Sequence, residues 1–288
     1  MKLYKIAKGI LLEHNNSAYI IDDEWDSLIN RDDLAGYLEL ISADTTPIND
    51  EVKNEHLNGK ILPPIGSQEV WAAGVTYLKS RDARMEESES SGGASLYDKV
   101  YDAPRPELFF KAIAQRVSGT GAEVYIRKDS EWNVPEPELT LFINSKGNTQ
   151  GYTIGNDMSS RSIEGENALY LPQAKIYEKS AALGPCLLVA TELIAAESGI
   201  KMTIKRNDEI AYQDATTVSR MKRSLTELTG YLYSECDFPV GAFLMTGTCL
   251  VPPPTFTLEA GDVVEISIDG IGTLVNTIAL NPKHNNKV

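Results

Sequence analysis

The sequence has no excess of positive charge. Its 288 residues include 27 lysines and arginines against 41 aspartates and glutamates, which gives a formal net charge of -14 at pH 7. Binding to a nucleic-acid backbone depends largely on lysine and arginine side chains that displace counterions from the phosphates. We therefore exclude DNA and RNA as main partners of this protein.

Long apolar runs are also missing. The sequence has no stretch long enough to span a bilayer, and residues 1–19 lack the apolar core and the small-residue cleavage site of a signal peptide. The composition, with 42% hydrophobic and 24% charged residues, is typical of a globular protein. We therefore expect no membrane partner and a cytoplasmic location.

Cysteine and histidine are scarce. The three cysteines lie far apart, form no CxxC pair and have no neighbouring histidine, which indicates reduced and mostly structural thiols. The histidines are His14, His56 and His284, so none lies between residues 57 and 283. The middle of the chain therefore has no histidine for acid–base catalysis.

Local patterns divide the chain near residue 65. Residues 1–65 combine strand-like segments with leucines at helical intervals, and "NGKILPPIGSQ" places glycine and a proline pair at the junction. The remainder is rich in strands and includes a hairpin with its turn at Asn207 and Asp208. We predict an α+β, β-dominated fold with a small N-terminal α/β domain over residues 1–65 and a larger domain over residues 66–288.

A charged helix and a flexible segment are expected after the first strand of the larger domain. The helix is "LKSRDARMEESES", and the serine- and glycine-rich segment is "SSGGASLYDKVYD". The composition of the second segment predicts a mobile loop. Because a mobile loop beside a site can act as a lid, we assign Glu86 and Glu87 to this lid.

Two acidic motifs are the strongest chemical signal. In "VPEPELTLF", residues 134–142, Glu136 and Glu138 are two positions apart, so both face one side of an extended chain. After a turn, "YTIGNDMSSRS" brings Asp157 to the end of the next strand. Converging carboxylates repel each other unless they are protonated or share a cation, and all-oxygen ligands suit Mg²⁺, Mn²⁺ or Ca²⁺ rather than Zn²⁺. On spacing alone, a solvated strand face and ordinary turn chemistry explain the same residues.

The order of seven short strings resembles the fumarylacetoacetate hydrolase superfamily over about residues 68–282. The strings are "GVTY", "PELFFK", "VPEPELTLFIN", "GYTIGNDMSSRS", "AKIYEKSAALGP", "FLMTGTCLVP" and "LEAGDVVEISIDGIGTLVN". The resemblance implies a mixed β-sheet roll in a catalytic domain, divalent-metal ligation by Glu136, Glu138 and Asp157, and a homodimer or homotetramer. The ligand type favours Mg²⁺ as the cofactor, with Mn²⁺ as a substitute and Ca²⁺ as an ion that binds without turnover.

Two longer strings, "VWAAGVTYLKSRDARMEES" and "YLPQAKIYEKSAALGP", look most like the branch of 2-keto-3-deoxy sugar-acid dehydratases. That branch carries an active-site lysine after the last metal ligand, which falls at Lys175 here. The resemblance implies a metal-dependent hydro-lyase of pentose catabolism that takes a small 2-keto acid as its substrate. Loss of water would convert a 2-keto-3-deoxypentonate, such as 2-keto-3-deoxy-D-arabinonate, to 2,5-dioxopentanoate.

Elimination of water also needs an acid and a base. The candidates for the acid or base are Glu107, in "PELFFK", and Glu86 or Glu87, in the charged helix. Glu107 is favoured because a carboxyl group at the edge of a buried strand is more easily desolvated. A surface glutamate after Pro106 is the alternative interpretation. The residues expected to bind the substrate are Thr76, Lys111, Thr248 and Arg81. Arg84 lies on the same charged helix as Arg81, and such helix faces are usually only solvated.

Two other functions stay open at this stage. Acylpyruvate hydrolases and oxaloacetate decarboxylases of the same superfamily would stabilise the same enolate, although the hydrolases generally use a histidine and glutamate pair that this region lacks. A non-catalytic protein would keep the metal cluster only for stability and would bind a ligand without turnover. The products separate these alternatives, because dehydration keeps the carbon skeleton intact.

Overall fold

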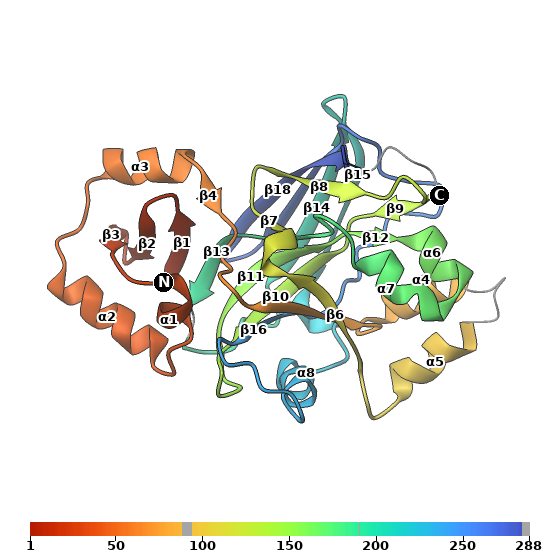
Figure 1. The fold of residues 1–288 in the computed structure, drawn as a ribbon, viewed down its shortest axis with the longest axis horizontal. Helices are drawn as coiled ribbons and strands as arrows, with labels where there is room; N and C mark the ends of the chain where they lie inside the picture. The colour runs from red at the N-terminus through yellow and green to blue at the C-terminus, as the bar shows by residue number, and fades with distance from the viewer. Residues whose placement is uncertain (88–93, 190, 284–288) are drawn as a thin grey trace.

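The fold is built on one large mixed sheet that crosses the molecule (Figure 1). The computed structural model describes residues 1–87, 94–189 and 191–283. In sheet order, the main strands are β3 (Ser17–Ile21), β2 (Gly9–His14), β1 (Lys2–Ile6), β13 (Ala181–Val189), β11 (Thr149–Asp157), β10 (Pro137–Ile143), β16 (Ala242–Met245), β5 (Glu69–Gly74) and β6 (Glu107–Ile113). Two short strands pair at its margins, β4 (Ile61–Leu62) with β1 and β7 (Val117–Ser118) with β13. This sheet-dominated mixture of strands and helices confirms the predicted α+β class.

A smaller sheet packs against the middle of the large one. Its order is β15 (Glu209–Thr217), β14 (Gly199–Arg206), β17 (Val263–Ile268), β18 (Gly272–Leu280) and β8 (Ala122–Ile126). The predicted hairpin turn at Asn207 and Asp208 is confirmed, and both residues have positive φ angles, 52° and 64°, as a two-residue hairpin turn favours. Apolar side chains from both sheets, including Leu141 and Ile266, form one buried cluster. The short strands β9 (Asn133–Val134) and β12 (Ser159–Ser160) pair separately.

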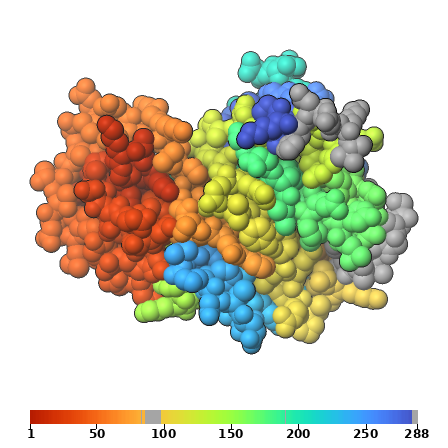
Figure 2. Space-filling model, in the orientation of Figure 1, coloured from red at the N-terminus to blue at the C-terminus, as the bar shows by residue number. Residues whose placement is uncertain are grey.

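Residues 1–65 form a rounded lobe at one end of the molecule, drawn in red and orange (Figures 1 and 2). Its strands β1, β2 and β3 extend the large sheet because β1 pairs with β13. Its helices are α1 (Trp25–Ile29), α2 (Leu34–Asp44) and α3 (Asp50–Asn58). Trp25 and Leu38 from these helices share a buried cluster with Phe142 and Phe243 from the central strands. The lobe and the body thus share one sheet and one core, and the domain division at residue 65 stays a prediction.

Helices α4 (Leu78–Glu87), α5 (Ala94–Asp102), α6 (Arg161–Glu166) and α7 (Leu171–Lys175) gather at the end of the molecule away from the lobe (Figure 1). The prediction of a mobile loop is wrong for Ala94–Asp102, which form α5. Apolar residues recur there at the four-residue spacing of a helix, as in Leu96 and Val100, whereas the glycines precede the helix. Residues 90–93, the start of the expected loop, lie outside the described residues.

One helix and three short 3-10 turns complete the elements. They are α8 (Leu225–Leu232), η1 (Ala114–Arg116), η2 (Ala168–Tyr170) and η3 (Val218–Arg220). Ser224 caps α8, because its hydroxyl oxygen accepts from the Glu227 amide at 3.1 Å. Among the described residues, no helix is long and apolar enough to cross a bilayer.

Candidate metal and active site

Strands β10 and β11 bring the predicted metal ligands together. The two strands are antiparallel neighbours whose register pairs Glu138 with Gly155, so the start of β10 lies beside the end of β11. Glu136, just before β10, meets Asp157, the last residue of β11, and the Asp157 amide donates to the Glu136 carbonyl oxygen at 2.9 Å. One ligand oxygen from each of Glu136, Glu138 and Asp157 lies within 4.8 Å of the other two. These three buried residues are called the acid cluster below.

Gly247 completes the backbone around the acid cluster. Its amide donates to Oε2 of Glu138 at 2.6 Å. The residue has a φ of 96°, which favours glycine, and a Cβ atom there would lie 2.0 Å from Oγ1 of Thr76. The glycine in "TGT" therefore allows a backbone conformation and a close contact with Thr76 that a side chain would prevent.

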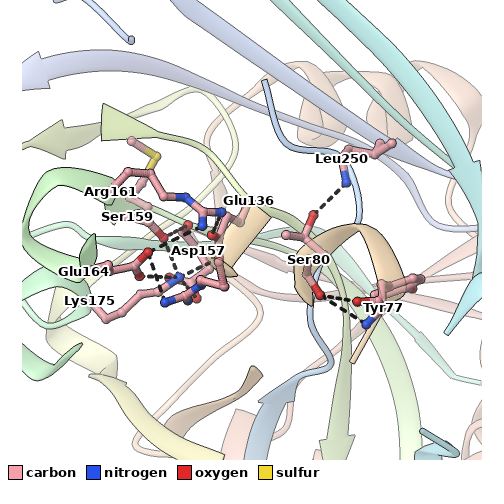
Figure 3. A network of polar contacts seen from close by, with 12 residues as sticks. Tyr77, Ser80, Glu136, Asp157, Ser159, Arg161, Glu164, Lys175 and Leu250 are labelled. Atoms are coloured by element: carbon pink, nitrogen blue, oxygen red, sulfur yellow. Dashed lines mark hydrogen bonds and ion pairs between the residues drawn. The ribbon is translucent and has the colours of Figure 1, made fainter. Parts of the chain in front are cut away.

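Lys175, at the end of α7, reaches into the acid cluster (Figure 3). Its Nζ lies 2.5 Å from Oε2 of Glu136, 3.1 Å from Oδ2 of Asp157 and 2.5 Å from the hydroxyl oxygen of Ser159. Burial alone lowers the pKa of an ammonium group, but the charges of Asp157 and Glu136 outweigh it here and hold the pKa of Lys175 above its ordinary value. Lys175 is therefore a buried cation.

Lys111, on β6, is fully buried and has three contacts. Its Nζ donates to the carbonyl oxygens of Met158 and Lys175, at 2.9 and 2.6 Å, and lies 2.5 Å from Oδ1 of Asp157. Two of the three ammonium protons are therefore used in hydrogen bonds to the backbone, and the contact with Asp157 is an ion pair. The arrangement favours a role in fixing Asp157 and the end of α7, and contact of Lys111 with a substrate stays a prediction.

A network of buried charged side chains contacts the acid cluster. The prediction from the sequence missed two of its members, Arg161 and Glu164. Arg161 pairs with Glu136, and its Nη1 lies 3.6 Å from Oε2 of Glu164. Nη1 of Arg84, on α4, lies 3.2 Å from the same oxygen. Each of the three side chains is at most 5% exposed. The only signal in the sequence is the three-residue spacing of Arg161 and Glu164, which solvated helix pairs share.

The acid cluster fits a magnesium ion. All its donor atoms are carboxylate oxygens, which Mg²⁺ prefers. Among the described residues, Glu138 forms no ion pair, whereas Glu136 and Asp157 pair with Lys175. Burial, together with the charges of Asp157 and Glu136, holds the pKa of Glu138 well above its ordinary range. A divalent cation would offset this repulsion at the one carboxylate that lacks a counter-charge.

A small cavity of about 10 Å³ adjoins the acid cluster. Its lining includes the acid cluster, Lys175, Gly74, Thr248 and, from α4, Ser80 and Arg84. This volume holds about one water molecule, so a five-carbon acid does not fit. Substrate entry therefore requires that a lining element move. Helix α4 is part of the cover, and the side chains of Glu86 and Glu87 in its last turn lie outside the described part of the structure.

Glu107 lies directly over Gly74. The two residues are partners in the ladder between β5 and β6, and a Cβ atom on Gly74 would fall 1.9 Å from Oε2 of Glu107. That oxygen is buried and has no hydrogen-bond partner among the described residues. Burial raises the pKa of the Glu107 carboxyl group above its ordinary value. These features fit the expected acid or base, whose role stays a prediction.

The structure places Thr248, Thr76 and Arg81, which were also predicted to bind the substrate, in different surroundings. Thr248 lines the cavity. Thr76 is fully buried and donates its hydroxyl hydrogen to the carbonyl oxygen of Thr246 at 2.7 Å. Arg81 pairs with Asp82 and is not among the residues that line the cavity, whereas Arg84 is. Of the two arginines on α4, the structure therefore brings the second one into the site.

Comparison with known proteins gives matches along most of the chain. Residues 70–279 match the family described as fumarylacetoacetate (FAA) hydrolase, C-terminal. A protein of Haloferax volcanii named probable 2-keto-3-deoxyxylonate dehydratase is 45% identical over 242 residues, which cover 84% of this chain and 82% of the relative. The 2-dehydro-3-deoxy-D-arabinonate dehydratase of Saccharolobus solfataricus is 40% identical over 221 residues, or 76% of this chain and 74% of the relative.

A solved structure extends the match to the lobe. It is 2-keto-3-deoxy-D-arabinonate dehydratase complexed with magnesium and 2,5-dioxopentanoate, which is 31% identical to this chain, with a TM-score of 0.83 over 98% of this chain and 99% of its own. The resemblance that the short strings indicated is confirmed, and it reaches beyond residues 68–282. The chain therefore belongs to the fumarylacetoacetate hydrolase family.

Proposed function

We propose that this protein is a divalent-metal-dependent dehydratase, a hydro-lyase that converts a 2-keto-3-deoxypentonate such as 2-keto-3-deoxy-D-arabinonate to 2,5-dioxopentanoate and water. The relatives named as dehydratases, and the related structure with magnesium and 2,5-dioxopentanoate, support it. The observation that carries it is a buried acid cluster with Lys175 on one side, together with Glu107, whose Oε2 has no hydrogen-bond partner in the described part of the chain. Dehydration needs these groups and no histidine.

In this proposal, Glu136, Glu138 and Asp157 hold Mg²⁺. When bound, the ion supplies a Lewis acid for the 2-keto acid end of the substrate. Lys111 keeps the Asp157 carboxylate in place by holding Oδ1 at 2.5 Å, and the Gly247 amide holds Oε2 of Glu138 at 2.6 Å. Both contacts orient their carboxylates before any ligand arrives.

Lys175 serves as a fixed positive charge. In the metal-free protein the neighbouring carboxylates hold its pKa above the ordinary value, and we assign it the role of a cation rather than that of the base. Its ammonium group lines the cavity beside Glu136 and Asp157. There it donates a hydrogen bond to the substrate carboxylate or to the C2 oxygen, on which negative charge develops when the C3 proton leaves.

Glu107 serves as the group that moves protons. In the elimination, the C3–H bond breaks and its proton goes to a base, while the C4 hydroxyl group accepts a proton and leaves as water. A further proton moves from C5 to C3, and the resulting C4–C5 enol becomes the C5 aldehyde. A carboxyl group whose pKa is raised by burial can both donate and accept protons near neutral pH.

The test is turnover of 2-keto-3-deoxy-D-arabinonate, with and without Mg²⁺, followed by mass spectrometry of the product. We expect a product that has lost one water and retains all five carbons, and we expect EDTA to abolish it. Acylpyruvate and oxaloacetate are the control substrates. Cleavage of these acids, with the sugar acid left unchanged, would show that the site performs a different reaction of the family.

Two finer statements complete the proposal. By resemblance to the family we propose a homodimer or homotetramer, which light scattering of the purified protein would measure. The cytoplasmic location expected from the sequence also stays a prediction, and cell fractionation would test it.

A further inference from the structure

Arg84 brings a buried charge from helix α4 into the site. Its side chain is 5% exposed and lines the cavity, and its Nη1 lies 3.2 Å from Oε2 of Glu164. Arg81, three residues earlier, has a side chain that is 26% exposed and pairs with Asp82. Of these two arginines, only Arg84 connects α4 to the charges around the acid cluster.

Glu164 links Arg84 to Lys175. Oε1 of Glu164 lies 3.4 Å from Nζ of Lys175, and that Nζ lies 2.5 Å from Oε2 of Glu136. A continuous chain of charges therefore runs from α4, through α6 and α7, to the acid cluster. Figure 3 shows its part from Glu164 through Lys175 to Glu136. Glu164 is 2% exposed, and a buried carboxylate is costly unless cations surround it. Without Arg84, Glu164 would compete more strongly with Glu136 and Asp157 for Lys175.

We propose that Arg84 is a positioning residue for the dehydration, which holds Lys175 at the acid cluster through Glu164 when α4 covers the cavity. This inference rests on the proposed function. The cavity is too small for the substrate, so its cover must open and close in each turnover. Each closure of α4 rebuilds the Arg84–Glu164 pair and thereby returns Lys175 to its place.

The kinetic test is Arg84→Gln assayed with 2-keto-3-deoxy-D-arabinonate and Mg²⁺. We expect kcat to fall about 10- to 100-fold, as for other residues that orient active-site groups, with KM changed by less than about threefold. Arg84→Lys retains the charge and restores much of kcat. A large rise in KM with kcat unchanged would show that Arg84 binds the substrate directly. An unchanged kcat and KM would show that Arg84 has no role in the reaction. Either result would overturn the proposal.

The double variant Arg84→Gln/Glu164→Gln tests whether Arg84 acts on Lys175 through Glu164. Because Arg84 acts through Glu164, the double variant should have a kcat no lower than that of Glu164→Gln alone. If the fold-losses of kcat in the two single variants multiply in the double variant, Arg84 acts independently of Glu164. The matched control is Lys79→Gln, which removes a cation from the same helix whose side chain is 65% exposed and pairs with Asp214 on β15. It should keep the wild-type kcat and KM.

A measurement without substrate separates this inference from the proposed function. Hydrogen exchange of the backbone amides of α4 should be faster in Arg84→Gln and in Glu164→Gln than in the wild type and in Lys79→Gln. If the wild type does not dehydrate the sugar acid, the proposed function fails. Hydrogen exchange then tests by itself whether Arg84 ties α4 to Glu164. Unchanged exchange in Arg84→Gln would then overturn the tie between α4 and Glu164.

Discussion

The apolar core beneath the N-terminal lobe is as deeply buried as the acid cluster. The two regions, however, contain opposite kinds of side chain. The core contains apolar residues such as Leu3, Trp25 and Phe142, whereas the cluster and its network hold carboxylates, lysines and arginines with almost no exposure. Both regions meet on β10, whose seven residues are all buried. Apolar burial stabilises a fold directly, but buried ion pairs contribute little net stability. The comparison indicates that the charged residues at the start of β10 serve the reaction rather than the stability of the fold. The apolar residues at the other end of the strand hold them in place.

The largest expected effect of a single change is on activity, at the charged end of β10. Glu138→Gln removes one carboxylate of the acid cluster, and we expect kcat for dehydration to fall about 10³-fold, or by about 4 kcal/mol in the barrier. Stability of the metal-free protein should not fall, because Glu138 forms no ion pair among the described residues and its charge is repelled by Glu136 and Asp157. Urea unfolding in EDTA, beside the kinetic assay, measures both. A variant that retains activity would contradict the metal assignment.

The neighbouring carboxylate should behave in the opposite way when stability is measured. Glu136→Gln removes the carboxylate that pairs with both Lys175 and Arg161 at the acid cluster, and Glu164 is then the carboxylate these two cations still share. Removal of one member of a buried ion pair costs about 3 to 5 kcal/mol, so the free energy of unfolding in EDTA should fall by about that amount. Equal stabilities of Glu136→Gln and Glu138→Gln would show that the two carboxylates have the same surroundings, contrary to the structure.

At the apolar end of the same strand, stability and activity should separate. Leu141→Ala removes a fully buried side chain from the core between the two sheets, and we expect unfolding to become easier by about 2 to 5 kcal/mol. The kcat of the folded protein and its affinity for Mg²⁺, measured by calorimetry below the unfolding transition, should stay close to those of the wild type. A selective loss of Mg²⁺ affinity would mean that the two ends of β10 are coupled.

The smallest expected effect comes from a methyl group beside Glu107. Gly74→Ala places a Cβ atom where Oε2 of Glu107 lies, so the carboxyl group must move, and we expect kcat to fall about tenfold. Affinity for Mg²⁺ should not change. The matched control is Gly36→Ala in helix α2, where a Cβ atom would meet nothing within 4 Å. If both variants keep the wild-type kcat, Glu107 does not act from its position over Gly74.

Strand geometry made the convergence of the acid cluster predictable, whereas its role as a metal site came from the family resemblance. A two-residue period puts Glu136 and Glu138 on one face, and a hairpin between β10 and β11 brings Asp157 to the same end. Lys175 came only from the family resemblance, because nothing in its local sequence shows that α7 ends at the cluster. Gly247 was predictable only as a place of close backbone approach, since its contact with Glu138 depends on how β16 pairs with β10.

The charged residues of the helices were not predictable in the same way. Arg81 and Arg84 share one charged helix, and the sequence does not say which side of that helix faces the sheet. Burial of Arg84 depends on the packing of α4 against α6, which brings Glu164 to it. The segment that forms α5 was mistaken for a loop because its serine and glycine content was read together with the helical residues that follow.

The pairing of β1 with β13 has a consequence for how the chain is made. Lys2 and Leu3 lie opposite Leu188 and Leu187, so β1, which pairs with β2 directly after it, reaches its second neighbour only when the chain has been made as far as β13. Strand β10 pairs with β11 directly after it, but its other neighbour, β16, begins only at residue 242. Such distant pairings make folding slow and leave apolar strand edges open in the meantime. We therefore expect one edge of β1 and one edge of β10 to stay open in the growing chain until β13 and β16 have been made.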